Sequence, residues 1–373
     1  MKRIASVVLS LTLALGLMAG CGAAAEYPED VTELDWDALR AKYDLGTEVL
    51  SIDGETADWG EFFYWLFYSY KNYVKETGEI TDFDAPYIYD ESLTVGEMLI
   101  DAAKGFCVQY HALSVNAAKE GVELTEEDEA ALQEAQESEM LQLVGEDGTE
   151  EEFFELLDEA YVSRELFDLM NRTAALYSRA YTTLYGGAGE KLTEQEVLDF
   201  AEENGFMTAK HILIRTTDDE GEPLDEAAKA EKRAVAEELY AGLKDKSGAE
   251  LEEAFDALMQ EKSEDTGLAA FPDGYCFTSG EMLEAFETTT AALEPGQMSG
   301  IVESDFGYHI ILRLPLTPED RVMKFDSDGT PYTIRAMAAV NLYEARRLGW
   351  IENADVSWAP GFEDLEIKEM FGL

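Results

Sequence analysis

The chain has 373 residues, more than one ordinary domain holds, so two or three domains are expected. Hydrophobic residues make up 46% of it, with 18 Tyr, 18 Phe and 5 Trp, which supports packed cores and excludes global disorder. Its 80 acidic and 27 basic residues give a formal net charge of −53. Such a surface repels phosphate, which excludes nucleic acid as a partner, and any attachment to a membrane must depend on something other than charge.

The N-terminus has the layout of an export signal. Two basic residues precede an apolar stretch, 4–17, that is too short to span a bilayer comfortably. Small residues then lead to Cys21, which resembles the lipobox of bacterial lipoproteins, where cleavage precedes a cysteine that carries diacylglycerol. The alternative is an ordinary secretory signal with an incidental cysteine. We expect a lipoprotein signal peptide over 1–20, lipidation of Cys21 and a tether over 21–30.

Only two cysteines, Cys107 and Cys276, remain after the N-terminal one. A disulfide between them is one outcome, and two buried free thiols are the commoner one. Neither cysteine has the spacing of metal ligands around it, and the chain has three histidines in all. We therefore expect no metal site and no cofactor.

The N-terminal region, 31–205, has helical patterns and few strands. A strand that ends in a turn is predicted over 49–54, and Asp58 is predicted to cap an aromatic-rich helix over 59–75. Apolar residues at intervals of three and four predict further helices over 93–120, 125–144, 151–184 and 193–204. This region contains no catalytic constellation.

From residue 206 the pattern changes to alternating strands and helices. In chain order the predicted elements are a strand at 208–216, helices at 225–246 and 249–259, a strand at 275–277, a helix at 280–293, and strands at 299–303 and 308–314. This β-α-α-β-α-β-β order fits a compact α+β domain of about 110 residues. The tail from residue 316 is predicted to hold a helix over 334–348 and a segment around Trp358.

Residues 206–316 resemble the parvulin-type (PpiC, rotamase) peptidyl-prolyl isomerases. The opening strand, AKHILI at 209–214, looks like the first strand of that family, and GEM at 280–282, FE at 286–287 and FGYHII at 306–311 match its closing half in order and spacing. The resemblance implies an antiparallel sheet of about four strands flanked by helices. It also implies a non-covalent prolyl cis-trans isomerase.

The resemblance assigns polar residues to the site one by one. His211 and His309 occupy the positions of the family's two strand histidines, and Asp265 occupies that of the Asp or Cys that faces the pair. Ser304 resembles the hydroxyl that hydrogen-bonds the histidines. A lone histidine on a strand is usually structural. Here, however, two of the three histidines in the chain occupy the family's two histidine positions, which favours a site. The third, His111, lies in a predicted helix and is expected to be structural.

Three apolar residues resemble the family's proline pocket: Met282 and Phe286 as its floor, predicted four apart on one helix face, and Phe277 as a third wall. A Met-Phe pair at this spacing is more often core. The chemistry nevertheless suits these residues, because rotation about the amide is opposed by about 18–20 kcal/mol and needs no covalent step. An apolar pocket that grips the proline ring and excludes water can favour the twisted bond.

One segment departs from the family pattern. The family usually carries Gly-Gly-Asp-Leu-Gly before the pocket phenylalanine, whereas this chain has FPDGYCF at 271–277 and a shorter loop. The difference bears on the placement of Asp265 and on the width of the pocket. The loop has no basic cluster, so no preference for phosphorylated Ser/Thr-Pro is expected.

The flanking regions resemble PrsA- and SurA-like foldases, in which N-terminal helices and a C-terminal tail pack together around an inserted parvulin domain. We therefore expect 31–205 and 317–373 to form a mostly helical chaperone-like region around the parvulin domain at 206–316. The implied partners are unfolded or newly translocated polypeptides with Xaa-Pro bonds. The implied location is the outer side of the cell membrane, or its periplasmic face if the cell has an outer membrane.

Two alternatives stay open. The first is a holdase chaperone whose parvulin domain binds proline-containing segments without significant catalysis. The second is a solute-binding lipoprotein, which would need two α/β lobes with repeated parallel βαβ units. The long helical N-terminal half argues against this second alternative.

Overall fold

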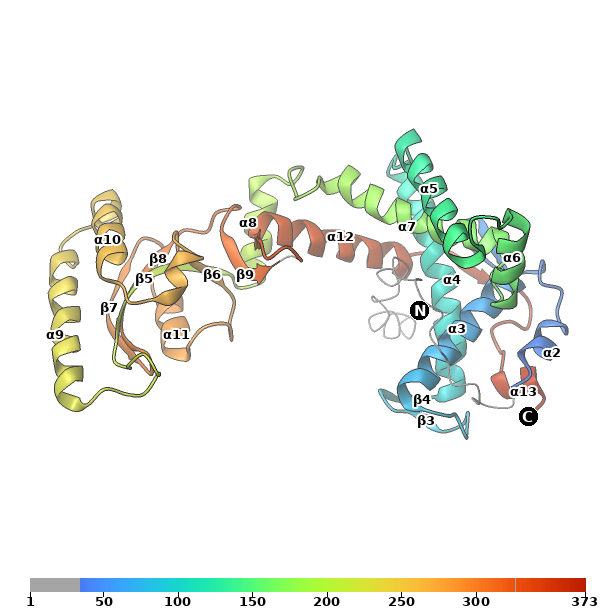
Figure 1. Cartoon of the computed structure of the whole chain (residues 1–373), viewed down its shortest axis with the longest axis horizontal. Coiled ribbons are helices and arrows are strands. Elements are labelled where there is room, and N and C mark those ends of the chain that lie inside the picture. Colours follow the sequence, from blue (N-terminus) through green and yellow to red (C-terminus); the bar gives the residue numbers. More distant parts are fainter. Residues whose placement is uncertain (1–33, 326) are drawn as a thin grey trace. The chain divides into compact units, whose positions relative to one another are not determined.

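The computed structural model describes residues 34–325 and 327–373, so the predicted signal peptide, the lipidation site Cys21 and the tether lie outside the described residues. The described chain divides into two compact units (Figure 1). The first comprises the described residues up to Leu184 together with Tyr343–Leu373, and the second is Tyr185–Leu342. Within these described ranges, every helix is too short or too polar to serve as a membrane span.

Two long helices, α3 (Trp59–Thr77) and α4 (Val95–Lys119), pack together in the first unit and confirm two predicted helices. Each begins at a side-chain cap, because Asp58 and Thr94 accept hydrogen bonds from backbone N–H groups of the first turn. The aromatic residues of α3 face inward: Phe62, Phe63 and Trp65 are at most 2% exposed. They are core residues.

The other helices that lie wholly or partly in this unit are α2 (Trp36–Arg40), α5 (Glu126–Val144), α6 (Glu150–Glu159), α7 (Arg164–Tyr185), α12 (Ile334–Glu352) and α13 (Ile367–Phe371). The helical pattern predicted over 151–184 is present as two helices, α6 and α7. The chain turns at Tyr161, whose φ of 64° is left-handed, and α7 then starts where the Ser163 hydroxyl accepts from the N–H of Leu166.

Both parts of the first unit contribute to one small sheet. Strand β1 (Glu48–Ile52) forms a hairpin with β2 (Glu55–Asp58) and pairs antiparallel with β11 (Val356–Trp358) near the C-terminus. A separate hairpin consists of β3 (Pro86–Tyr87) and β4 (Asp90–Thr94). The C-terminal segment therefore completes a sheet that the N-terminal segment begins.

The second unit is organised around a six-stranded sheet in the order β10-β9-β6-β5-β8-β7. Its strands are β5 (Met207–Arg215), β6 (Tyr275–Phe277), β7 (Met298–Ser304), β8 (Gly307–Leu314), β9 (Arg321–Phe325) and β10 (Pro331–Thr333). The four predicted strands are neighbours and antiparallel, which confirms the predicted sheet. Strands β9 and β10 follow the predicted parvulin segment in sequence and extend the sheet beyond β6. Strand β9 runs parallel to β6 and antiparallel to β10.

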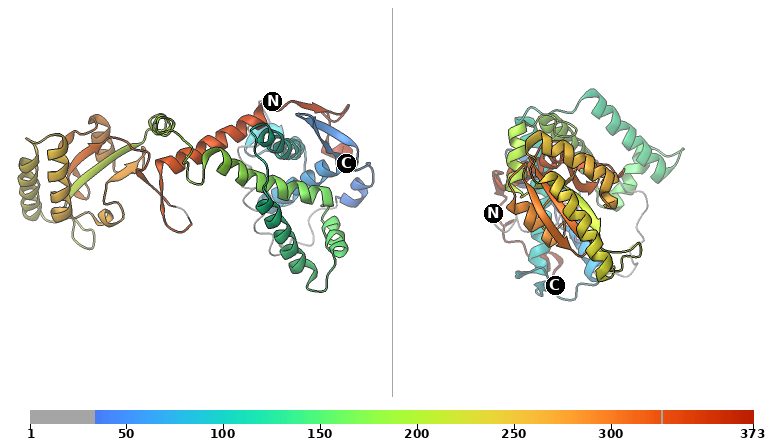
Figure 2. Two further views of the ribbon diagram at one scale, coloured as in Figure 1. Left: turned by 90° about the horizontal axis from the view of Figure 1, so that it is seen from above. Right: turned by 90° about the vertical axis from the view of Figure 1, so that its left-hand side faces the viewer.

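Helices cover this sheet on both faces (Figures 1 and 2). The helices that lie wholly within the second unit are α8 (Glu194–Glu203), α9 (Glu226–Leu243), α10 (Gly248–Lys262), the short 3-10 helix η2 (Thr266–Ala269) and α11 (Glu284–Ala292). Helices α9 and α10 pack on one face against residues such as Ile212 and Ile310. Helix α11 packs on the other face against Ala209 and Ile311. Because side chains alternate along a strand, His211 and His309 lie on the α11 face.

The helix predicted over 280–293 begins only at Glu284, so the expectation that Met282 and Phe286 share a helix face is wrong. Gly280 has a left-handed φ of 89°, which turns the chain before the helix. The Glu287 carboxylate then accepts hydrogen bonds from the N–H groups of Gly280 (2.8 Å) and Met282 (2.7 Å). These bonds hold Met282 in a turn that precedes α11.

The two cysteines of the described chain are free and buried, with Cys107 in α4 and Cys276 in β6. They belong to different units. The expectation of two buried thiols is confirmed, and the structure contains no disulfide between them.

Candidate active site

Two adjacent strands bring a pair of histidines together on the α11 face of the sheet. His211 in β5 and His309 in β8 face each other with their Nδ1 atoms 3.0 Å apart, and their rings are nearly parallel at 12°. The two residues are 7% and 3% exposed. A buried polar pair of this kind needs hydrogen-bond partners at its outer nitrogens as well.

Those partners are the other two polar residues predicted for the site. Asp265 Oδ2 lies 2.9 Å from Nε2 of His211, and Ser304 Oγ lies 2.7 Å from Nε2 of His309. Asp265 caps η2, where its Oδ1 accepts from the N–H of Gly267 at 3.0 Å. The shortened loop therefore still delivers a carboxylate to the histidines. The structure brings all four predicted polar residues into one hydrogen-bonded chain.

The acceptor atoms of these four hydrogen-bonded side chains determine which ring nitrogen of each histidine carries a proton. A carboxylate can only accept, so Nε2 of His211 donates to Asp265. With both rings neutral, Nδ1 of His211 then accepts from His309, whose Nε2 accepts from the Ser304 hydroxyl. One set of proton positions thus satisfies all three side-chain contacts.

Burial and neighbouring groups determine the charges of two of these side chains, Asp265 and His309. Burial opposes ionisation of Asp265, but hydrogen bonds from His211, Tyr275 and the Gly267 N–H outweigh it and lower the pKa of the carboxyl to about 2. Burial and the neighbouring His211 lower the pKa of His309 to about 4. At neutral pH the site therefore combines a carboxylate with a neutral His309.

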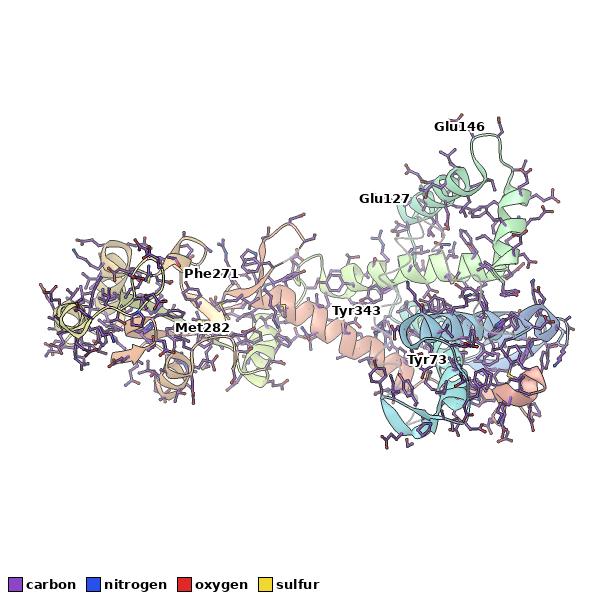
Figure 3. All side chains as sticks on the ribbon, turned by 60° about the horizontal axis from the view of Figure 1, so that its bottom comes forward. Tyr73, Glu127, Glu146, Phe271, Met282 and Tyr343 are labelled. Carbon is purple, nitrogen blue, oxygen red and sulfur yellow. The ribbon has the colours of Figure 1, made fainter. Side chains whose placement is uncertain are left out.

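The apolar residues predicted for the site lie beside the histidines. The Phe286 ring contacts both imidazoles edge-on, with centroids 5.2 Å from His211 and 5.9 Å from His309. Phe277 is fully buried behind Phe286, at a centroid distance of 5.7 Å. Met282 packs on the same cluster and is only half-buried (labelled in Figure 3). Phe286 and Phe277 therefore form a closed floor, and Met282 is the predicted pocket residue that is open to solvent.

Sequence reasoning did not single out two residues that hold this arrangement. Tyr275 donates a hydrogen bond to Asp265, and Glu287 fixes the turn that carries Met282. Tyr275 could have been found, because it alternates with Phe277 along a strand and so belongs on the same face. Glu287 belongs to the FE pair that the resemblance already used, but its contact with a backbone five residues earlier leaves no periodic signal.

The third histidine is bound to carboxylates in the first unit. His111 in α4 is 6% exposed, with Nε2 2.9 Å from Glu61 Oε2 and Nδ1 3.1 Å from Glu55 Oε2. Burial opposes its protonation, but hydrogen bonds and charge from Glu61 and Glu55 outweigh it and raise the pKa of His111. This histidine links α4 to α3 and β2.

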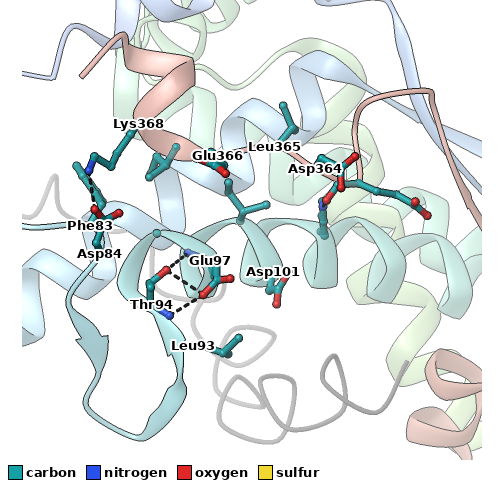
Figure 4. Close-up of a pocket in the computed structure, with 15 residues that line it drawn as sticks. Phe83, Asp84, Leu93, Thr94, Glu97, Asp101, Asp364, Leu365, Glu366 and Lys368 are labelled. Carbon is teal, nitrogen blue, oxygen red and sulfur yellow. Dashed lines mark hydrogen bonds and ion pairs between the residues drawn. The ribbon is translucent and has the colours of Figure 1, made fainter.

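A cavity of about 480 Å³ also lies in the first unit, between the start of α4 and the loop before α13 (Figure 4). Lys104 lines it and is 7% exposed, and its Nζ donates to the carbonyl of Glu363 and lies 5.1 Å from the Trp358 ring centroid. Several carboxylates line the rest, among them Glu97 and Asp364. None of the predicted site residues lines this cavity.

Comparison with known proteins adds independent findings. Residues 211–314 match the Rotamase family, described as the PPIC-type PPIASE domain. The chain is 39% identical over 105 residues to the chaperone SurA of Alkalilimnicola ehrlichii, which is 28% of this chain and 21% of that protein. It is 33% identical over 129 residues to the foldase protein PrsA 1 of Bacillus cereus, which is 33% of this chain and 37% of that protein. The chain thus spans well under half the length of these curated relatives.

Solved structures were also found. The crystal structure of a peptidylprolyl isomerase (PrsA) from Bacillus cereus covers 74% of this chain and 94% of its own, with 20% identity and a TM-score of 0.29. The PPIase domain of TbPar42 covers 29% of this chain and 99% of its own, with 25% identity and a TM-score of 0.25. The family match and the curated relatives agree with the resemblance seen in the sequence. Residues 211–314 of this chain therefore match a parvulin-type (PPIC-type) rotamase domain, and the chain is similar over 105 and 129 residues to a SurA chaperone and a PrsA foldase.

Proposed function

We propose that this protein is a peptidyl-prolyl cis-trans isomerase and foldase that acts on polypeptides outside the cytoplasm. One observation carries the proposal: a buried histidine pair, hydrogen-bonded to Asp265 and Ser304, lies edge to face with Phe286 beside the half-exposed Met282. Xaa-Pro bonds exchange over tens to hundreds of seconds without a catalyst, which is slow enough to limit folding. A foldase is useful where such bonds must exchange.

The proposed mechanism is non-covalent. The proline ring packs against Met282 over the closed floor of Phe286 and Phe277, which removes water from one side of the amide. Twisting the amide breaks its resonance and redistributes charge between nitrogen and oxygen. Fixed dipoles and a fixed carboxylate beside the bond can stabilise that distribution more than they stabilise either planar form.

Each polar residue has a proposed role in this scheme. Asp265, ionised and held on both oxygens, orients His211. His309 is neutral and joins His211 to the Ser304 hydroxyl. The four side chains present a rigid polar wall next to the apolar floor.

The clients and the location are part of the proposal. We infer that the clients are unfolded or newly translocated polypeptides with Xaa-Pro bonds, in line with the chaperone and foldase names of the relatives. We also infer a lipid anchor at Cys21 on the outer side of the cell membrane, from the lipobox-like sequence around that residue.

One observation favours the alternative of a holdase without significant catalysis. Phe286 is 2% exposed and Phe277 is fully buried, so most of the apolar floor is already covered by the protein itself. A proline ring would then bind on Met282 at the rim. In that case the domain would bind proline-containing segments but would grip the ring too weakly to twist the bond.

The two functions are separated by an isomerisation assay on an Xaa-Pro peptide, with the unmodified protein compared with His309→Ala and Met282→Ala. The proposal predicts a rate well above the uncatalysed one and a loss of at least about tenfold in each variant. Aggregation of an unfolded client would be measured with the same samples. Suppressed aggregation without any rate above the uncatalysed one in the unmodified protein would favour the holdase.

A further inference from the structure

Tyr275 lies in the segment, 271–277, that replaces the Gly-Gly-Asp-Leu-Gly pattern of the family. Its hydroxyl donates a hydrogen bond of 2.6 Å to Oδ2 of Asp265, the same oxygen that accepts from Nε2 of His211 at 2.9 Å. The residue is 8% exposed and pairs with Ala209 across the sheet. Its phenol therefore reaches the polar chain from a fixed position on a strand.

The loop around Asp265 is shaped to admit this phenol. A Cβ atom added to Gly267 would lie 2.1 Å from the Tyr275 hydroxyl oxygen, so no side chain fits at Gly267 while the hydroxyl is in place. The backbone N–H of Gly267 also donates to Oδ1 of Asp265 at 3.0 Å. The same glycine thus leaves room for the tyrosine and binds the second carboxylate oxygen.

Three separate segments therefore hold the Asp265 carboxylate. Gly267 in η2 binds Oδ1, while His211 in β5 and Tyr275 in β6 bind Oδ2. The Tyr275 ring is in turn packed against the imidazole of His211 (5.7 Å between centroids) and against Phe271 (5.2 Å). A donor this well fixed leaves the carboxylate little freedom to rotate.

The hydroxyl remains a donor over the whole working range of pH. Burial and the adjacent Asp265 carboxylate raise the pKa of Tyr275 well above its usual value. The phenol keeps its proton, and Asp265 can only accept.

We propose that Tyr275 is a positioning residue of the isomerase site, which holds Asp265 and through it the orientation of His211. This inference rests on the proposed function. It accounts for the altered loop, because the tyrosine and the glycine at 267 support Asp265 where the family pattern is absent. The alternative is that Tyr275 only fills space in the hydrophobic core, since its ring packs in the same cluster as Phe277 and Phe286.

The hydroxyl and the ring can be separated by Tyr275→Phe in the full chain. Positioning predicts that kcat on an Xaa-Pro peptide falls about fivefold while KM stays within about twofold, because a hydrogen bond to a charged group is lost but the apolar floor is intact. Tyr240→Phe is the matched control. Tyr240 is half-buried in α9 and packs on the other face of the sheet, so it should leave both constants unchanged.

A double-mutant cycle tests whether Tyr275 acts through Asp265. We expect Tyr275→Phe to reduce kcat by less than about twofold when Asp265 is already alanine, because its partner is then absent. Equal losses in both backgrounds, or no loss in the folded single variant, would overturn the inference. If the unmodified protein did not catalyse Xaa-Pro isomerisation at all, the proposed function itself would be contradicted.

A stability measurement checks the fit independently of activity. Gly267→Ala should lower the thermal midpoint more in the unmodified chain than in the Tyr275→Phe chain, since its methyl group collides with the hydroxyl that the second chain lacks. Equal losses of stability in both chains would contradict the packing on which the inference depends.

Discussion

The first unit places one histidine between two carboxylates, whereas the second places two histidines against each other with a carboxylate at one end. His111 has both ring nitrogens bound to acids, and the pKa of the ring is raised. His309 has another imidazole and a hydroxyl as partners, and its pKa is lowered to about 4. Burial is similar in the two regions, so the partners determine the charge of the ring.

The difference shows how a buried histidine that holds elements together can be told from one suited to chemistry. His111 joins α4 to β2 and to α3 through its contacts with Glu55 and Glu61. The histidine pair adjoins Phe286 and lies beside the half-exposed Met282, the surface that we propose binds a proline ring. If His111 is structural and the pair of His211 and His309 belongs to an active site, mutations in the two regions should have different effects.

Replacing His111 by glutamine should affect stability most. Removal of one partner from a buried pair leaves Glu61 without its counter-charge, which costs about 3 kcal/mol of unfolding free energy. Because the folded pKa of His111 is raised, the stabilisation is complete below the unfolded pKa and is lost as pH rises through the folded pKa. Chemical denaturation at several pH values should therefore show a smaller difference between the two proteins at alkaline than at mildly acidic pH. A difference independent of pH would contradict the ion pair.

Asp265→Asn should be the most damaging change to catalysis. The amide removes the negative charge, and its NH2 group must face either the Gly267 N–H or the donors of His211 and Tyr275, so we expect kcat/KM on an Xaa-Pro peptide to fall about thirtyfold. Asp273→Asn makes the same change on an exposed residue of the neighbouring loop and should leave the rate within about twofold. Similar losses in both variants would point to a general charge effect instead.

Met282→Ala should reduce kcat/KM about tenfold, because it removes the solvent-accessible apolar surface at the rim of the closed floor. Met282→Leu keeps most of the volume and should retain most of the rate. The matched control is Met298→Ala, since Met298 is also half-buried but packs in the core of the opposite face. An equal loss at Met298 would show that the effect comes from destabilisation.

The pH profile should show the smallest effect. Since the pKa of His309 is lowered to about 4 and that of Asp265 to about 2, neither group changes charge between pH 6 and 8. We expect a rate that is flat over this range and falls to about half near pH 4, as His309 gains a proton. The peptide assay at each pH, with circular dichroism to confirm folding, checks this. A rate that halves near pH 6.5 would contradict this expectation.

Much of the fold follows from local signals. Asp58 marked the start of α3 correctly, and the strand predicted over 208–216 is present as β5, which carries His211. The parts that the sequence did not reveal depend on contacts between distant segments or on side chains that bind the backbone. Glu287 holds Met282 out of the helix that periodicity predicted, and β9 joins the sheet by pairing with β6 about 45 residues earlier.

The same contrast applies to the site. Four polar positions could be assigned from the resemblance to the parvulin-type family, and the structure brings them within hydrogen-bond distance across a sequence separation of 98 residues between the histidines. Strand alternation could have placed Tyr275 on the face of the site, but it could not reveal the hydrogen bond to Asp265, which lies in a loop without a periodic pattern.

The most direct test measures isomerisation of one Xaa-Pro peptide by the unmodified protein, His111→Gln and His309→Gln, at a temperature where all three are folded. The account predicts that His309→Gln loses at least about tenfold in kcat/KM while His111→Gln stays within about twofold. An unmodified protein that does not exceed the uncatalysed rate, or equal losses in the two variants, would contradict it.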